Sequence, residues 1–525
     1  MKDKLSDFKK IMKFESSKRG DFSNLNYKPT FNASAIFYFV YDDNIDTKIS
    51  FLNYWKIKNF NKEVSCLFSI RDAFGKNIFR TFIKLKKNTY AFSIKKILKK
   101  NLGLAKLEGS VNVELFSTND LKFIYPAVDA IYETKNGITL IHSNQRILNE
   151  IHDKINNLSL NQTQSGFDIY NDNEKHSFIV AINGSMEVKS RNLKILFFNY
   201  LGKKFSKSFK FKSIKPYEII RIDFNKIKKL NSFLKNKKGF CKIDLPTENI
   251  FNRVLVGTTT KDNKRLTTTH SYYDCSNIKD FISIKKNDSS EKNCYIPFNI
   301  IDNIELDIVI YPIFSKCNLD FDLEMYDTSG KRCIVKSNIL RITSKLSNTL
   351  TIQVNKYLKN IKNLTQNVYS LTVRSKNGKI PSRITYGFNY RQKSFGSNIS
   401  DAMLINRGSQ SRGNKSKGFY WGPVFNSRKI SSIITLSNMN QLLKRNIQKI
   451  NLKIYNEKDI VIKKNYIIKS PEAKNIHLEN LFKNKKIKKS DDVFWFTIES
   501  SGPKNLVCKH VHKSVYGHIS ADHSF

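Results

Sequence analysis

The chain has 525 residues, 40% of them hydrophobic and 12% aromatic, and its formal net charge is +46. This length exceeds what a single hydrophobic core organises, so several domains are expected, and the apolar content excludes an intrinsically disordered chain. The seven cysteines are an odd number without Cys-x-x-Cys spacing, so neither a disulfide framework nor a zinc finger is indicated.

The positive charge has two interpretations. An excess of this size creates a positive potential that favours nucleic acids or other anionic polymers. However, Lys far outnumbers Arg, the residue best suited to bidentate phosphate contacts, and Asn, Ile and Phe are also abundant, as an AT-rich genome would dictate. We therefore favour a diffuse solvated charge, with nucleic-acid binding through Lys-rich faces as the alternative.

The sequence shows no export or membrane signal. Residues 1–30 contain no apolar run typical of a signal peptide, and no uncharged stretch reaches about 18 residues. A cytoplasmic protein without a membrane span is therefore expected, beginning with a flexible extension over residues 1–28.

The first landmark along the chain is a turn between two apolar segments that recurs about every 128 residues. Asp or Asn opens each copy, and Gly closes the first three: Asp72–Gly75, Asn199–Gly202, Asp327–Gly330 and Asn456–Asp459. The opening side chain can accept a hydrogen bond from the backbone two residues on, and Gly accepts a positive φ, so a hairpin turn is predicted. Asp459, which replaces Gly in the fourth copy, is expected to tolerate that conformation less well.

Strands with period-two patterning flank each turn, and the next segment changes its apolar spacing to three and four, which predicts a helical crossover. An alternating strand follows each crossover: Val111–Leu115, Ile243–Leu245, Tyr369–Val373 and Phe494–Ile498. The sequence therefore predicts an all-β fold of four tandem Greek-key β-sandwich repeats, each of about 128 residues and similar in architecture to immunoglobulin-like or jelly-roll domains. The repeats are expected at residues 29–156, 157–284, 285–412 and 413–525.

One position near the end of each repeat carries a histidine in three of the four copies. The predicted last strand ends in His-Ser at His142, His270 and His523, whereas the third repeat has Met403 at the matching place. In one interpretation each histidine fills the end of its own sandwich and is satisfied by hydrogen bonds. In the other, the packed repeats bring two or three of these histidines together as a ligand or metal site.

The last 16 residues concentrate further histidines. On a strand, His510 and His512 point to the same face, and Gly517 permits a bend that returns His518 or Asp522 beside them. A His-x-His pair with a third ligand suits zinc or another divalent transition metal, although such pairs also occur on solvated strands. The candidate metal ligands are His510, His512, His518 and His523.

An aromatic cluster lies at the junction of the third and fourth repeats. The segment Gly418–Pro423 predicts a tight turn that carries Tyr420 and Trp421. Two such rings can stack on a sugar or a base, while packing between domains is the alternative.

Standard catalytic motifs are absent from the sequence, which contains no P-loop, no GxGxxG after a strand, no GxSxG elbow and no HExxH. The sequence therefore favours a non-catalytic binding or assembly protein whose repeated loops meet a polymeric partner, a glycan or surface polysaccharide being the first choice and another protein the second. The ligand-binding candidates are His142, His270, Tyr420 and Trp421. A metal-dependent enzyme that uses the C-terminal histidines, joined by His142 or His270 from a packed neighbour, is the alternative from another class.

Overall fold

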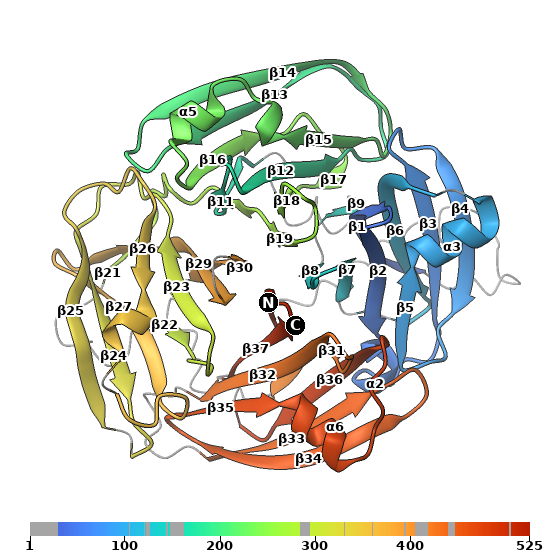
Figure 1. Ribbon diagram of the computed structural model, residues 1–525. Coiled ribbons are helices and arrows are strands. Elements are labelled where there is room, and N and C mark those ends of the chain that lie inside the picture. Colours follow the sequence, from blue (N-terminus) through green and yellow to red (C-terminus); the bar gives the residue numbers. More distant parts are fainter. Residues whose placement is uncertain are drawn as a thin grey trace, which may run out of the picture.

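The computed structural model describes residues 30–103, 105–119, 121, 126–142, 145–147, 162–283, 295–329, 331–359, 361–392, 395–404, 418–438, 447–502 and 506–525. The predicted extension over residues 1–28 lies outside them. Within the described residues the protein is all-β, with antiparallel sheets and short helices, which confirms the predicted β-sandwich fold class (Figure 1). No helix in this part of the chain is long and apolar enough to span a bilayer.

The first sandwich contains the sheets β1-β6-β3-β4 and β5-β2-β7-β8. Its strands are β1 (Phe31–Tyr41), β2 (Ile45–Leu52), β3 (Val64–Asp72), β4 (Asn77–Lys84), β5 (Thr89–Ser93), β6 (Leu107–Ser117), β7 (Val128–Thr134) and β8 (Ile138–His142). Helix α2 (Tyr54–Ile57) follows β2, and helix α3 (Ile94–Leu102) carries the chain from one sheet to the other. Ser93 begins α3 by accepting a hydrogen bond from the backbone of Lys96, and Gly103 ends it with a φ of 67°.

The second sandwich repeats this arrangement with added short strands. Its sheets are β14-β13-β16-β10-β20, in which β11 also pairs with β16, and β15-β12-β18-β19. A further short pair, β9 with β17, joins it to the first sandwich. The elements are β9 (Arg146–Ile147), β10 (Gln164–Ser165), β11 (Asp168–Ile169), β12 (Lys175–Ile182), β13 (Val188–Phe198), β14 (Lys204–Ile214), β15 (Ile219–Asp223), η1 (Phe224–Lys226), α5 (Leu230–Leu234), β16 (Gly239–Asp244), β17 (Ile250–Phe251), β18 (Leu255–Thr260), β19 (Leu266–His270) and β20 (Tyr272–Tyr273).

The third sandwich has the sheets β22-β27-β24-β25 and β26-β23-β29-β30, and the short strands β21 and β28 pair beside it. Its strand order is that of the first sandwich, element for element. The elements are β21 (Phe281–Ser283), β22 (Tyr295–Phe298), β23 (Glu305–Ile310), β24 (Leu319–Tyr326), β25 (Arg332–Ile342), β26 (Leu350–Gln353), η2 (Val354–Tyr357), β27 (Val368–Ser375), β28 (Lys379–Pro381), β29 (Arg383–Gln392) and β30 (Phe395–Leu404).

The fourth sandwich has the same order again, in the sheets β31-β36-β33-β34 and β35-β32-β37-β38. The elements are β31 (Gly418–Phe425), β32 (Ile430–Asn438), β33 (Ile447–Tyr455), β34 (Ile460–Lys469), β35 (Glu472–His477), α6 (Leu478–Asn484), β36 (Val493–Ser500), β37 (Leu506–Ser514) and β38 (Ile519–His523). The predicted crossovers are confirmed, since α3, η1 with α5, η2 and α6 directly follow the equivalent strands β5, β15, β26 and β35. That the four sandwiches are copies of one unit, with the expected boundaries, stays a prediction.

The predicted hairpin turns form as their side chains dictate. Asp72 accepts hydrogen bonds from the backbone of Phe74 and Lys76, and Gly75 has a φ of 83°. The corresponding turns are opened in the same way by Asn199, Asp327 and Asn456. In the first turn the N–H of Asp72 donates to the carbonyl of Lys76, four residues on. In the fourth turn the N–H of Asn456 donates to the carbonyl of Asp459, only three residues on. Asp459 is therefore not required to adopt a positive φ, and the strain expected there does not arise.

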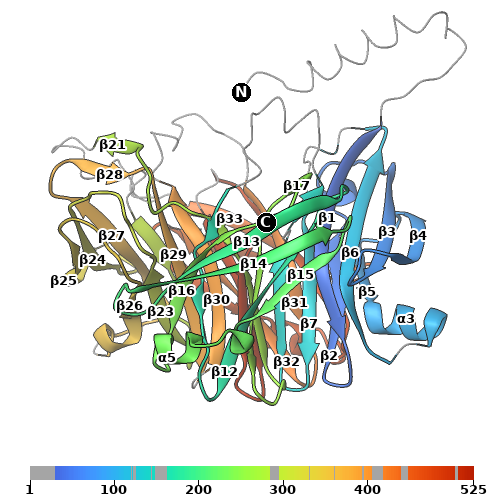
Figure 2. The ribbon, with the colours of Figure 1, turned by 90° about the horizontal axis from the view of Figure 1, so that it is seen from above.

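The four sandwiches stand side by side in a closed ring (Figure 1); strands such as β1, β2, β7 and β30 run roughly along the ring axis, whereas the outer strands β13 and β14 are oblique to it (Figure 2). The last strand of each sandwich lies innermost, and these strands contact one another in sequence: β8 with β19, β19 with β30, β30 with β38, and β38 with β8. Apolar cores cross the interfaces between neighbouring sandwiches, which we call seams. One cluster of buried residues joins the first, second and fourth sandwiches, and another joins the third to the fourth. The second and third meet through Phe198, Phe240, Val309 and Tyr311. The ring is therefore one packed body.

Candidate functional site at the ring centre

The innermost strands bring together three of the histidines that the sequence singles out. His142, His270 and His523 are the last residues of β8, β19 and β38, which belong to three different sandwiches. The ring centroid of His142 lies 4.8 Å from that of His270 and 4.5 Å from that of His523. One possible ligand atom from each of the three residues lies within 4.8 Å of the others. The fourth strand, β30, has Met403 at the matching place, and the side chains of β30 lie outside the described part.

The hydrogen bonds of the three imidazoles fix how each ring is oriented. Nδ1 of His142 is 2.8 Å from Oδ2 of Asp522, and Nδ1 of His270 is 2.8 Å from the carbonyl oxygen of Ser271. Nδ1 of His523 is 3.3 Å from the carbonyl oxygen of Ser524. Because each of these oxygens is an acceptor, Nδ1 carries the proton in all three rings.

Burial keeps the centre low in net charge. Desolvation lowers the pKa of His142, although the negative charge of Asp522 acts in the opposite direction. Desolvation also holds the pKa of His270 well below its usual range, and the positive charge of the nearby Arg253 lowers it further. Burial alone would raise the pKa of Asp522, but the hydrogen-bonded His142 outweighs it and keeps that pKa low. Burial also raises the pKa of Asp129, which faces Asp522. The centre therefore holds the neutral imidazoles of His142 and His270, together with the carboxylate of Asp522 and the guanidinium of Arg253.

The other predicted metal ligands lie elsewhere in the fourth sandwich. His510 and His512 are on the same face of β37, as expected, and Nδ1 of His510 is 2.9 Å from Nε2 of His512. Nδ1 of His512 is in turn 2.8 Å from Oγ of Ser432, so these rings form a buried hydrogen-bonded chain inside the sandwich. Asp522 is directly opposite His510 in the sheet, as the bend at Gly517 predicts.

His518 does not join this group. It directly precedes β38, whose last residue is His523, so about 16 Å separates the two at the rise of a strand. Its ring packs on Gly137 of the first sandwich, where an added Cβ would come within 2.2 Å of its Nδ1. The structure therefore divides the four candidate ligands: His523 joins His142 and His270, His510 and His512 bond to each other, and His518 stands apart.

The segment Gly418–Pro423 is a strand, so the predicted tight turn is wrong. Its Gly and Pro residues are tolerated because β31 is at the edge of its sheet, where the absence of an N–H on Pro423 removes no hydrogen bond between strands. Trp421 is only 5% exposed and packs on Tyr54 of the first sandwich, with ring centroids 5.0 Å apart. This burial leaves no open face of Trp421 for a sugar, and the ring instead helps to join the first and fourth sandwiches. Tyr420, beside it, is half-buried.

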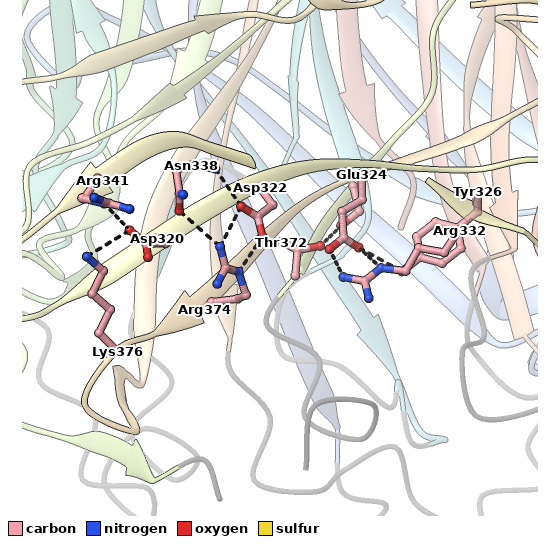
Figure 3. Close-up of polar contacts among 11 residues, drawn as sticks. Asp320, Asp322, Glu324, Tyr326, Arg332, Asn338, Arg341, Thr372, Arg374 and Lys376 are labelled. Carbon is pink, nitrogen blue, oxygen red and sulfur yellow. Dashed lines mark hydrogen bonds and ion pairs between the residues drawn. The ribbon is translucent and has the colours of Figure 1, made fainter. Parts of the chain in front are cut away.

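A row of carboxylates on the outer face of β24 forms a second polar cluster (Figure 3). Asp320, Asp322 and Glu324 alternate with the buried Leu319, Phe321 and Leu323, as period-two patterning predicts. Each carboxylate is held by an Arg: Asp320 by Arg341, Asp322 by Arg374, and Glu324 by Arg332. Carboxylates neutralised in this way stabilise the sheet and have no free partner for acid–base catalysis.

Replacing Asp322 by Ala is expected to lower the free energy of unfolding by about 1–3 kcal/mol, the contribution of hydrogen bonds to a charged group. Asp322 accepts two bonds from Arg374 and one, 2.8 Å long, from the backbone of Asn338. Urea denaturation followed by circular dichroism measures the change. Asp492→Ala, at an exposed position, is the matched control and should change stability by less than about 0.5 kcal/mol. Equal effects of the two substitutions would contradict a stabilising role for the row.

A polar groove of about 720 Å³ opens at one end of the second sandwich. Three segments that are distant in sequence form it: the turn before β12, the crossover from η1 to α5, and the turn after β18. Its polar lining includes carboxamides, one carboxylate, one imidazole and three ammonium groups: Asn171, Asp172, Asn173, His176, Asn225, Asn231, Lys228, Lys229 and Lys261. Asp172 is fixed by two backbone N–H groups, those of Glu174 and Lys175.

Sequence reasoning missed the groove and also Arg253, whose Nη1 is 3.3 Å from Nε2 of His270. Asn and Lys are so common throughout the chain that those of the groove carry no distinctive pattern. Arg253 has no equivalent at the matching place in the other repeats, so the repeat gives no signal for it. No protein-family model matches the chain, and no curated protein sequence is significantly similar to it.

Proposed function

We propose that the protein is a non-catalytic binding or assembly protein that recognises an anionic polymer, with an acidic surface polysaccharide as the first candidate. The polar groove of the second sandwich is the observation that carries this proposal. Carboxamide groups both donate and accept hydrogen bonds, as sugar hydroxyls do, so the Asn residues of the groove suit a glycan. Lys228, Lys229 and Lys261 add positive charge that suits carboxylate or sulfate groups.

The position of the groove supports the proposal. Loops at the end of a sandwich tolerate sequence change while the sheets hold them in place, and binding residues are commonly found there. In the ring, the crossovers α3 and α5 lie on the same side (Figure 2), so loops of neighbouring sandwiches face the same way. Weak contacts at several such loops would add up along a polymer. The net charge of +46 would speed the encounter with any polyanion.

Charge reversal in the groove tests the proposal. The triple variant Lys228→Glu, Lys229→Glu and Lys261→Glu should bind immobilised alginate, an acidic polysaccharide, at least tenfold more weakly than the native chain, as measured by surface plasmon resonance. A matched control reverses three exposed lysines on the outer strand β34, Lys463, Lys464 and Lys469, and changes the net charge equally. This control should lose less than threefold, because the charges removed lie outside the groove.

The outcomes separate the possible partners. Equal losses in both triple variants would assign binding to diffuse charge and contradict the groove. Retention of a single-stranded RNA but not of alginate, with affinity falling steeply as salt rises, would support nucleic-acid binding instead. No retention of alginate, of dextran sulfate or of neutral dextran would overturn the glycan proposal.

A further inference from the structure

The three central histidines lie close enough together to share one ion, because one ring nitrogen of each lies within 4.8 Å of the others. Since Nδ1 of each ring donates to an oxygen, Nε2 of each ring keeps its lone pair. The hydrogen bond from Arg253 to Nε2 of His270 supports this assignment independently, because a guanidinium can only donate. Three lone pairs that come from three sandwiches, two of them on buried rings, are an arrangement that a cation would stabilise.

We propose that His142, His270 and His523 together bind one divalent transition-metal ion, zinc being the best fit, which cross-links the first, second and fourth sandwiches at the ring centre. Neutral imidazole is the commonest zinc ligand, and metal-bound histidines typically donate their other N–H to a carboxylate or a backbone carbonyl. Asp522 and the carbonyl groups of Ser271 and Ser524 are those acceptors here. Asp522 is a positioning residue that orients His142 and adds a compensating negative charge.

The distances are compatible with such an ion. Zinc bonds to histidine are about 2.0–2.1 Å long, so ligand atoms around a tetrahedral ion lie about 3.3 Å apart. The three ligand atoms lie within 4.8 Å of one another, so they must approach by up to about 1.5 Å. His523 is half-buried at the end of β38, where a rotation of its side chain can supply this movement.

Arg253 limits the affinity of the site. Its guanidinium donates to Nε2 of His270, so it must move away before a metal can bind there. It lies 6.0 Å from the ring centre of Tyr272 and can stack on that face instead. Arg253→Gln, which removes a positive charge beside the ion, should therefore strengthen metal binding about tenfold.

Metal analysis of the full-length protein tests the proposal. After incubation with Zn²⁺ and gel filtration, inductively coupled plasma mass spectrometry should find one zinc ion per chain. Co²⁺ in place of zinc should give the visible absorption bands of a four-coordinate site with nitrogen ligands. Zn²⁺ should also raise the melting temperature, because an ion that binds only the folded ring stabilises it.

Single variants identify the ligands. His523→Ala, at the partly exposed end of β38, and His270→Ala should each raise the dissociation constant for Zn²⁺ at least 100-fold, and Asp522→Asn should raise it about tenfold. His477→Ala is the matched control, since His477 is exposed, and it should leave binding unchanged. Circular dichroism establishes which variants fold, and a folded His523→Ala protein suffices for the test. Zinc below one-tenth per chain in the native protein would overturn the proposal, and so would zinc bound equally by His523→Ala, which would show incidental surface binding. Neither result depends on whether a polysaccharide binds the groove.

Discussion

Trp495→Ala is expected to lower the free energy of unfolding by about 3–5 kcal/mol, the range for removing a large aromatic side chain from a core. Trp495 is fully buried in β36, within the apolar cluster that joins the fourth sandwich to the first. Its indole N–H donates to Oγ of Ser50, 2.9 Å away on β2 of the first sandwich, and Ser50 in turn donates to the carbonyl of Tyr90. The substitution therefore leaves a cavity and removes a polar contact across the seam.

Urea denaturation followed by far-ultraviolet circular dichroism measures this loss. Phe74→Ala removes an aromatic ring that is 65% exposed, and it should cost less than about 0.5 kcal/mol. Trp495→Phe should recover more than half of the loss, because it restores most of the buried volume. A Trp495→Ala protein as stable as the Phe74→Ala protein would show that the first and fourth sandwiches do not depend on this seam.

The second large effect is a dependence of stability on pH that His518 causes. Burial, together with the nearby Arg265, lowers the pKa of His518 from 6.5 to about 3. Below pH 6.5 the unfolded chain therefore binds a proton at this residue that the folded chain does not. The stability contributed by the neutral ring is present above pH 6.5 and is lost as the pH falls toward 3, at about 1.4 kcal/mol per pH unit.

Comparison of His518→Gln with the native chain isolates this contribution. Gln cannot be protonated, so the slope of the unfolding free energy against pH, between pH 6 and pH 4, should be smaller in the variant by about 1.4 kcal/mol per pH unit. The measurement is a series of urea denaturations at different pH values. His477→Gln, at an exposed position, should leave the slope unchanged. Parallel pH curves for His518→Gln and the native chain would contradict the burial of a neutral ring at this position.

The sequence predicts those parts of the fold that local chemistry determines. Asp72 and Gly75 specify a hairpin turn through their own side chain and backbone, and the alternation of Asp320, Asp322 and Glu324 with apolar residues specifies a strand with one buried face. The helical crossovers follow from a change in apolar spacing within a few residues. Each of these features depends on neighbours in the chain and on no contact between sandwiches.

The sequence does not determine features that depend on packing across the ring. The common spacing of His142, His270 and His523 predicts equivalent positions in their sandwiches, but only the closed ring makes their rings contact one another. Arg253 approaches His270 within one sandwich, through the pairing of β18 with β19, and no motif in the sequence marks that contact. The segment Gly418–Pro423 contains residues that normally interrupt strands, and it forms one because its place is at a sheet edge.

Trp421 and Trp495 contact the first sandwich across its seam with the fourth, and Trp55, the third and last tryptophan of the chain, packs on Tyr54, which Trp421 contacts. The other three seams contain none. Tryptophan emission therefore reports on one interface alone: it should shift to longer wavelength when water enters between the first and fourth sandwiches, even if every sandwich stays folded. Opening of the ring can thus be observed optically, without a label, and separately from unfolding of its parts.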